Sequence, residues 1–199
     1  MKLFPDEAIT APDWRLAPSF LEADAADRLF DALMRQTPWR EDRLRLGGRE
    51  VTAPRRVSWH GDPHCVYRYS GARHAPAPWF PALGDLREAV IAAAGHRFNC
   101  ALLNLYRDGR DSMGWHSDDE PELGLNPAVA SVSLGAERRF RFRSRQDPEE
   151  THALTLPHGS LLVMRPGCQS RWRHALPKSA AVASPRINVT FRWIADGAA

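Results

Sequence analysis

The 199-residue chain is short of several residue types, and each shortage excludes a class of protein. Its three cysteines, Cys65, Cys100 and Cys168, are an odd number, lie far apart and form no CxxC pair. Such a set argues against a disulfide framework and a structural zinc site, so we expect reduced, mostly buried thiols. No apolar run approaches the roughly 18 residues that span a bilayer, and the first residues lack the apolar region of a signal peptide. We therefore expect a soluble, cytoplasmic protein, with a monomer as the default.

Lysine is also scarce, because 25 of the 27 basic residues are arginine, and the formal net charge is only +3. Arginine makes planar, two-pronged contacts with carboxylates and phosphates, which favours an anionic partner or cofactor. A GC-rich genome would produce the same bias. Composition alone therefore favours a nucleic acid partner only slightly.

Apolar residues are plentiful, at 43%, and we expect residues 1–199 to form one domain with a real core. Residues 19–36 have the spacing of an amphipathic helix, with Ser19 and Glu22 as a capping box. A second helical pattern covers residues 84–95 and ends at a glycine, a natural C-terminal cap. The rest has the pattern of short strands and proline-rich loops. The sequence thus predicts a mainly β (α+β) fold, a sandwich or jelly roll with helical cover.

Alternation along the strands separates polar from apolar faces. Asn104 and Tyr106 share the polar face of one strand. Residues 139–145 alternate arginine with phenylalanine; this row is either a solvated face or, on a nucleic-acid-binding protein, a track for phosphates. Trp115 either packs near a pocket or covers its strand. The last strand has a polar face and a fully apolar face, formed respectively by Arg186, Asn188, Thr190 and Arg192, and by Ile187, Val189, Phe191 and Trp193.

His116-x-Asp118 has the spacing of two metal ligands on one strand face. By itself the motif is uninformative, since about one HxD or HxE is expected by chance in this composition. A second pair at residues 60–62 is followed by proline, and we interpret it as a surface or turn feature. For the first pair, His174 is the best third ligand. Two imidazoles and one carboxylate leave three open sites on an octahedral metal, the arrangement that suits Fe(II) oxygenases.

Those three open sites can take a bidentate 2-oxo acid and dioxygen. The far carboxylate of 2-oxoglutarate requires an inward cation, and Arg186 and Arg192 share one strand face. The RxxxxxR spacing alone is common, with about three expected by chance. The opposite face of this strand is fully apolar, so both arginines are costly to bury unless a bound anion neutralises them. The arginine pair therefore indicates an anion site.

Several motifs between Pro38 and Trp193 occur in a distinctive order: APRRVSWHGD, YRYSG, NLYRDGRDSMGWHSDDE, SVSLGAERRFRFR, LPHGSLLVM, RHALPK and PRINVTFR. In that order they resemble the AlkB family of Fe(II)- and 2-oxoglutarate-dependent nucleic acid dealkylases, and most closely its duplex-DNA-repairing members. The resemblance implies a double-stranded β-helix core over about residues 96–195. It also implies N-terminal helices and a nucleotide-recognition lid over about residues 1–95.

Carried over position by position, the resemblance assigns three groups of site residues. The catalytic iron ligands would be His116, Asp118 and His174. The 2-oxoglutarate site would be lined by Asn104, Tyr106, Arg186, Thr190 and Arg192. On the substrate side it implies Tyr67 and Tyr69 around the flipped base, Asp119 and Glu120 on the lesion, Arg55 and Ser70 toward the DNA backbone, and Leu46 as a small wedge.

The implied reaction is DNA repair by oxidative demethylation of 1-methyladenine and 3-methylcytosine, in which 2-oxoglutarate is decarboxylated and formaldehyde is released. These lesions are cationic near neutral pH, so aromatic rings and a carboxylate attract them over the neutral bases. Flipping is cheapest where the methyl group has already broken the base pair.

One departure from the family pattern bears on the substrate. The hairpin tip reads Leu46-Gly47-Gly48, where duplex-repairing members have a bulky apolar residue, so single-stranded DNA or RNA becomes more credible. The alternatives are an oxygenase of the same chemistry acting on RNA, protein or a small molecule, and a binding module that has lost catalysis. The basic, aromatic lid argues against a small molecule, and the complete triad argues against lost catalysis.

Overall fold

The structure is a computed structural model that describes residues 9–11, 13–46, 49–69 and 72–195. Within these ranges the helices are α1 (Ala23–Gln36), α2 (Pro81–Ala94), the 3-10 helix η1 (Pro121–Leu123) and α3 (Cys168–Arg171). The strands are β1 (Ile9–Thr10), β2 (Trp14–Ala17), β3 (Arg40–Leu46), β4 (Arg49–Gly61), β5 (Tyr67–Tyr69), β6 (Ala72–His74), β7 (Cys100–Tyr106), β8 (Met113–His116), β9 (Val129–Gly135), β10 (Arg138–Ser144), β11 (Thr151–Leu156), β12 (Ser160–Met164), β13 (Trp172–Leu176) and β14 (Arg186–Arg192).

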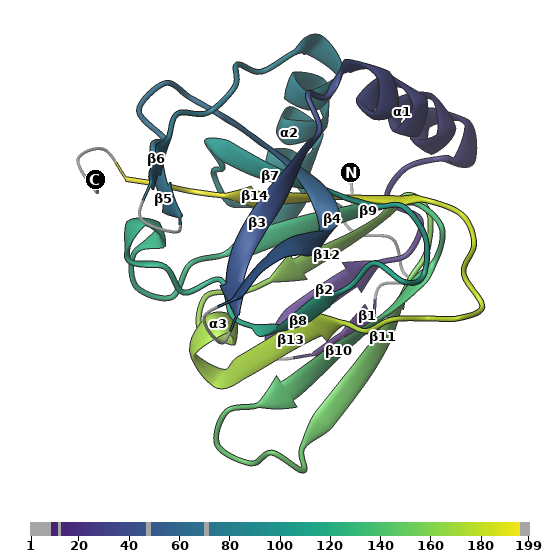
Figure 1. Cartoon of the computed structure of the whole chain (residues 1–199). Helices are drawn as coiled ribbons and strands as arrows, with labels where there is room; N and C mark the ends of the chain where they lie inside the picture. The colour runs from purple at the N-terminus through teal and green to yellow at the C-terminus, as the bar shows by residue number, and fades with distance from the viewer. Residues whose placement is uncertain (1–8, 12, 47–48, 70–71, 196–199) are drawn as a thin grey trace.

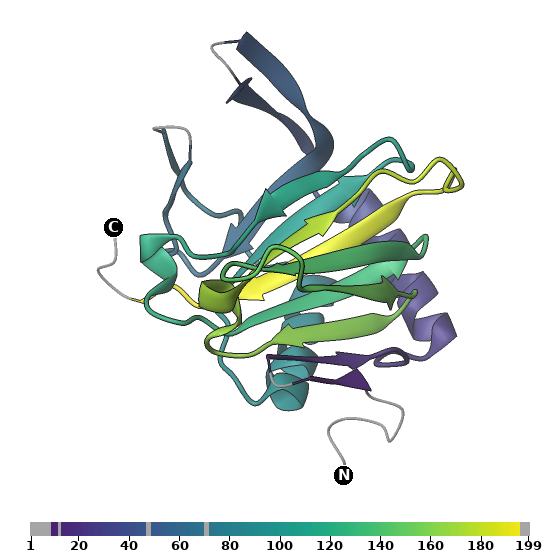
Figure 2. The ribbon, with the colours of Figure 1, turned by 90° about the horizontal axis from the view of Figure 1, so that it is seen from below.

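Most of the strands form two antiparallel sheets that face each other (Figures 1 and 2). The larger sheet has the order β1-β2-β12-β9-β14-β7-β4-β3, and the smaller one the order β11-β10-β13-β8. β5 and β6 form a separate hairpin. Sheet neighbours are often distant in sequence, since β14 lies between β9 and β7, as in a jelly roll. The predicted mainly β jelly roll is confirmed.

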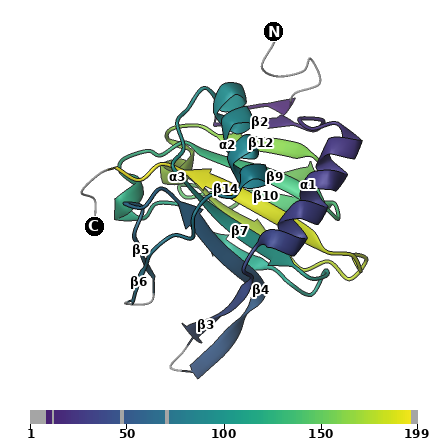
Figure 3. The same cartoon turned by 90° about the horizontal axis from the view of Figure 1, so that it is seen from above.

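Both long helices cover the outer face of the larger sheet (Figure 3). α1 begins at Ala23 with Glu22 as its N-cap and no side-chain capping bond, so the predicted capping box of Ser19 and Glu22 is wrong. The residues before the helix are held elsewhere, because the Leu21 amide donates to the Gly159 carbonyl. α2 starts earlier than predicted, with a proline in its first turn, and it ends at the predicted glycine.

The β14 strand shows how the sequence pattern positions polar groups. Ile187, Val189 and Phe191 are fully buried in the cluster between the larger sheet and the helices. The alternate side chains line a cavity between the two sheets. A second apolar cluster fills the rest of that space, where Trp14 stacks on Phe142 with ring centroids 4.3 Å apart. Each fully buried large apolar side chain contributes roughly 1.5–3 kcal/mol to the stability of the fold. The apolar face of β14 therefore holds its polar residues in place.

Two hairpins project from the same side of the sandwich (Figures 2 and 3). One pairs β3 with β4, with Leu46 opposite Arg49; the predicted tip, Gly47-Gly48, lies outside the described residues. The inner half of β4 continues into the larger sheet, where Val57 lies opposite Asn104 of β7. Strands from before and after residue 95 therefore share one sheet.

All three cysteines are buried and form no disulfide, as predicted. Among the helices in the described ranges, none combines the length and the apolar character needed to cross a membrane.

Candidate metal centre and the cavities beside it

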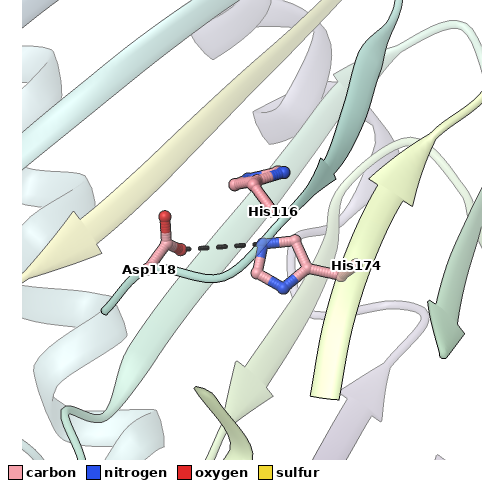
Figure 4. A group of neighbouring side chains, drawn as sticks. All are labelled: His116, Asp118 and His174. Atoms are coloured by element: carbon pink, nitrogen blue, oxygen red, sulfur yellow. Dashed lines mark ion pairs between the residues drawn. The ribbon is translucent and has the colours of Figure 1, made fainter. Parts of the chain in front are cut away.

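Three side chains predicted to bind metal converge between the sheets. The ligand atoms of His116, Asp118 and His174 all lie within 4.8 Å of one another, and in the described part of the chain no other group of three has this arrangement. The antiparallel pairing of β8 with β13 places His116 directly opposite His174. Asp118 follows two residues after the end of β8, and its Oδ2 lies 3.8 Å from His174 Nε2 (Figure 4). The predicted triad is therefore assembled by the fold.

The surroundings prepare each of the three as a ligand. Nδ1 of His116 lies 2.9 Å from the Gly114 carbonyl, and donation there leaves Nε2 with the lone pair that binds a metal. Burial, together with the nearby His116, lowers the pKa of His174 to about 3, so its imidazole is neutral near pH 7. Burial opposes ionisation of Asp118, but the charge of Arg192 and both histidines outweigh it and lower its pKa to about 2.

Asp118 is also held in position by two contacts. Arg192 Nη2 donates to its Oδ1 at 2.5 Å, and its backbone amide donates to Gln169 Oε1 at 3.0 Å. A buried, ionised and oriented carboxylate beside two imidazoles is the donor set that Fe(II) oxygenases use. The residues present therefore fit the metal that the sequence predicts.

A cavity on one side of the triad contains every residue predicted for 2-oxoglutarate. Arg186 is a charged residue of its lining and is only 2% exposed. Burial lowers the pKa of Arg186 to about 10, its Nη2 donates to Ser133 Oγ at 2.8 Å, and its Nε has no hydrogen-bond partner. No carboxylate in the described ranges pairs with this guanidinium. The polar lining comprises Asn104, Tyr106, Ser131, Arg186, Asn188, Thr190 and Arg192.

A buried arginine without a carboxylate is costly unless an anion joins it, so this cavity fits a dicarboxylate such as 2-oxoglutarate. Sequence reasoning missed Ser131 and did not assign Asn188. Asn188 donates to Ser131 Oγ at 2.7 Å and accepts from Thr190 at 2.9 Å, which fixes the hydroxyl of a predicted residue. The signal for Asn188 was present, because it lies between Arg186 and Arg192 on the polar strand face.

A second cavity adjoins the first and shares part of its wall. His116, Asp118 and Arg192 line both cavities. The second is also lined by β3, by β4 and by the segment after Asp118. Its remaining residues are Arg40, Asp42, Arg55, Val57, Trp59, Leu102, Met113 and Glu120.

Only one of the two surplus acids after Asp118 enters this cavity. Glu120 lines it as predicted, but Asp119 is exposed and pairs with Arg145 at 2.7 Å. The prediction that Asp119 faces the damaged base is therefore wrong. Its contact with Arg145 holds the Asp119 carboxylate on the exterior, away from the cavity.

The other predicted substrate residues fall in three places. Arg55 is buried on the cavity wall and its Nε donates to Asn104 Oδ1 at 3.0 Å, so it connects the two cavities and does not lie on an exposed path for a DNA backbone. Tyr67 and Tyr69 form β5, and their side chains lie outside the described part. The same holds for the side chain of Leu46 and for all of Ser70.

Sequence reasoning missed Asp42, Trp59 and Met113 in the second cavity. The signal for Trp59 was its period-2 alternation with Arg55 and Val57 on β4. The indole Nε1 donates to the Cys65 carbonyl at 3.1 Å, which fixes the ring against the wall.

The second HxD pair is not a surface feature. His60 is a buried residue of β4 that lies 3.0 Å from Ser58 Oγ and 2.9 Å from the Pro78 carbonyl, and burial lowers its pKa. Asp62 accepts from Trp79 Nε1 at 2.8 Å. The interpretation of the pair as a surface or turn feature is therefore wrong for His60, which is buried in β4, whereas Asp62 lies just beyond the end of that strand and is partly exposed.

Comparison with known proteins agrees with this geometry. The 2OG-Fe(II) oxygenase superfamily matches residues 13–192. Alpha-ketoglutarate-dependent dioxygenase alkB homolog 3 of Bos taurus is 40% identical over 191 residues, which cover 90% of this chain and 65% of the relative. The DNA oxidative demethylase ALKBH2 of Mus musculus is 37% identical over 205 residues, covering 94% of this chain and 86% of the relative.

The solved structure of OsALKBH1 matches with a TM-score of 0.65 and 18% identity, covering 93% of this chain and 100% of that one, which shows a shared fold. The chain spans about two thirds of the length of the alkB homolog 3 relatives, at 65% for the bovine protein. The superfamily match covers nearly the whole described chain, and it includes the triad and Arg186. The chain therefore belongs to the 2OG-Fe(II) oxygenase superfamily and, within it, to the AlkB family.

Proposed function

We propose that this protein repairs DNA by oxidative removal of N-methyl groups from 1-methyladenine and 3-methylcytosine. The observation that carries the proposal is the meeting of two cavities at the triad. One contains a buried arginine suited to a dicarboxylate, and the other presents carboxylates suited to a cationic base. The mouse relative's name, DNA oxidative demethylase, supports DNA as the substrate.

In this proposal His116, Asp118 and His174 hold Fe(II), which with 2-oxoglutarate and dioxygen supplies the hydroxylation of the N-methyl carbon, and the methyl group then leaves as formaldehyde. Arg186 binds the far carboxylate of 2-oxoglutarate as a charge partner. Arg192 keeps Asp118 ionised and oriented, because its guanidinium donates to the Oδ1 atom.

The second cavity selects the base through charge and apolar contact. Asp42 of β3 and Glu120 both line it, beside Arg40, which pairs with Asp42 at 3.4 Å, and the buried Arg55. The two carboxylates favour a cationic methylated base over its neutral parent. Trp59 and Met113 provide apolar wall that excludes water from the methyl group. Aromatic contacts from Tyr67 and Tyr69 stay a prediction of the family resemblance.

The test measures formaldehyde from oligonucleotides that contain 1-methyladenine, after anaerobic loading with Fe(II) and 2-oxoglutarate followed by air. Single-stranded DNA, duplex DNA and RNA of one sequence are compared, so that the strand and sugar preferences are measured together. We expect formaldehyde from DNA. We expect its loss in His116→Ala, by more than the 10–100-fold that removal of a supporting partner costs a metal site.

Two neighbouring acids provide a matched control. Asp118→Asn removes a metal ligand and should abolish formaldehyde release, whereas Asp119→Asn removes the same charge outside the cavity and should retain it. Formaldehyde that persists in the Asp118 variant, or none from any methylated oligonucleotide with the wild-type protein, would overturn the proposal.

A further inference from the structure

The outer face of the smaller sheet carries arginines that the proposed chemistry does not use. Arg139, Arg141 and Arg143 of β10 project away from the buried phenylalanines of the same strand. Arg173 of β13 is exposed and lies directly opposite Arg143 in the strand register, so both project from one face. Trp115 of β8 contacts two of these arginines, Arg141 and Arg143. These five residues are called the arginine face below.

The charge of the arginine face is not neutralised within the described part of the chain. None of its four guanidiniums forms an ion pair there, whereas Arg145, the next arginine of the row, pairs with Asp119. Across the sheet, β11 opposes β10 with the uncharged residues Thr151, Ala153 and Thr155. The acids of the following turn lie at one end, and Glu150 there is 4.0 Å from His152 Nε2. Like charges directly opposite each other destabilise a sheet, so this cluster calls for an anionic partner.

Trp115 organises two of the guanidiniums. The guanidinium carbon of Arg143 lies 4.5 Å from the centroid of the indole ring, and that of Arg141 lies 5.7 Å away. A guanidinium that stacks on a ring keeps its in-plane N–H donors available, and those donors match the oxygens of a phosphate. Stacking also reduces the side-chain freedom that would otherwise be lost on binding. The sequence left open whether Trp115 packs near a pocket or covers its strand, and these contacts support the second alternative.

The arginine face lies behind the metal centre. Trp115 and His116 are consecutive in β8, so they project from opposite faces of the smaller sheet. β8 is the edge strand of that sheet. A nucleic acid strand that leaves the second cavity thus reaches the arginine face by passing around one sheet edge.

We propose that the arginine face binds the phosphodiester backbone of DNA away from the damaged nucleotide, and so makes affinity depend on substrate length. The inference rests on the proposed function for its substrate. Phosphate contacts position a strand without reading its sequence, which suits an enzyme that must act on a lesion in any context. They also give a salt dependence that can be measured without turnover.

The binding test uses fluorescence anisotropy with a labelled, unmethylated single-stranded DNA of about 16 nucleotides, the upper site size of common single-strand binders. The variant Arg141→Gln/Arg143→Gln is compared with Arg28→Gln/Arg35→Gln, which removes two charges from α1 on the far side of the larger sheet. The slope of log K against log salt should fall in magnitude by about 1.4 in the first variant, at about 0.7 per lost phosphate contact. It should be unchanged in the second.

An activity arm separates this inference from the proposed function. With a long methylated oligonucleotide, Arg141→Gln/Arg143→Gln should raise KM about tenfold with kcat unchanged. With a methylated trinucleotide, both constants should match the wild type. An unchanged salt slope, or an equal fall in both double variants, would overturn the inference. A smaller slope in the arginine-face variant alone would uphold it even if no formaldehyde is formed, a result that counts against only the proposed function.

Discussion

At the scale of single residues, Arg186 should have opposite effects on ligand binding and on the stability of the fold. Its guanidinium is buried beside Ser133 with no carboxylate. We therefore expect it to lower the free energy of unfolding without ligand and to bind the anionic ligand when that is present. We expect Arg186→Met to leave the free energy of unfolding without ligand unchanged or to raise it by up to about 3 kcal/mol, because a buried charge is removed. Urea unfolding with and without 2-oxoglutarate, in the presence of redox-inert Mn(II), measures both effects.

The wild type should gain about 2.7 kcal/mol at a 2-oxoglutarate concentration 100 times Kd, and the variant should gain nothing. Arg138→Met is the control, because Arg138 is equally buried but its guanidinium donates to the carbonyls of Asp108, Asp111 and Pro177. We expect that control to be destabilised and to keep its response to 2-oxoglutarate. A destabilised Arg186 variant that still responds would assign Arg186 a structural role.

Residue types and spacing predicted the charged parts of the site well. Asn104, Tyr106 and both arginines of β14 lie on strand faces whose period is visible in the sequence. The triad was found through the HxD spacing and the family resemblance, because Asp118 lies beyond the end of β8. Asp119 was misassigned because no regular element covers residues 117–120, and alternation there depends on backbone angles that the sequence pattern does not reveal. Asp42 and Ser131 were missed because their approach to the site depends on how distant strands pair.

At the scale of elements, two glycines of one helix provide opposite predictions. Gly95 caps α2 with φ 71°, a left-handed conformation, and Gly84 lies inside α2 with nothing within 4 Å of the position a Cβ would occupy. Gly95→Ala should lower the free energy of unfolding by about 1 kcal/mol, because an L side chain is strained there. Gly84→Ala should raise it by up to about 1 kcal/mol through helix propensity. Urea denaturation of both variants measures the difference, and equal effects of one sign would contradict it.

Elements with strong local signals were also the ones predicted from sequence. The second helix ends at its glycine as predicted, and the alternation predicted from residue 139 onward matches the burial of β10. Every residue of β14 is buried, because its polar face lines a cavity and does not face solvent. The start of α1 was misplaced because the segment before it bonds to the Gly159 carbonyl of a distant turn. A tertiary contact of that kind leaves no mark in local sequence.

At the scale of the whole molecule, the triad makes the stability without metal depend on pH. His174 has a folded pKa of about 3, below its ordinary 6.5, so its contribution is complete above pH 6.5 and is lost as pH falls toward 3. Asp118, with a folded pKa of about 2, adds loss below its ordinary value of 3.8. The buried His60 adds loss in the same direction, because burial lowers its pKa too.

We therefore expect the free energy of unfolding without metal to fall by about 2 kcal/mol from pH 6.5 to pH 5 through His174 alone. Urea unfolding at pH 7.5, 6 and 5 measures the trend. His174→Gln should make it shallower, whereas His152→Gln, which changes an exposed histidine, should preserve it. A His174 variant as acid-sensitive as the wild type would contradict the assignment.

The register that sets His116 opposite His174 has a mechanical consequence. β8 has four residues, lies at the edge of its sheet, and pairs irregularly with β13 between His174 and Leu176. An ion bound to both histidines would link β8 to β13 and so stabilise this short edge strand. Removing iron would then also destabilise residues 113–116 locally. Their amide hydrogens would exchange with solvent before the rest of the sheet opens.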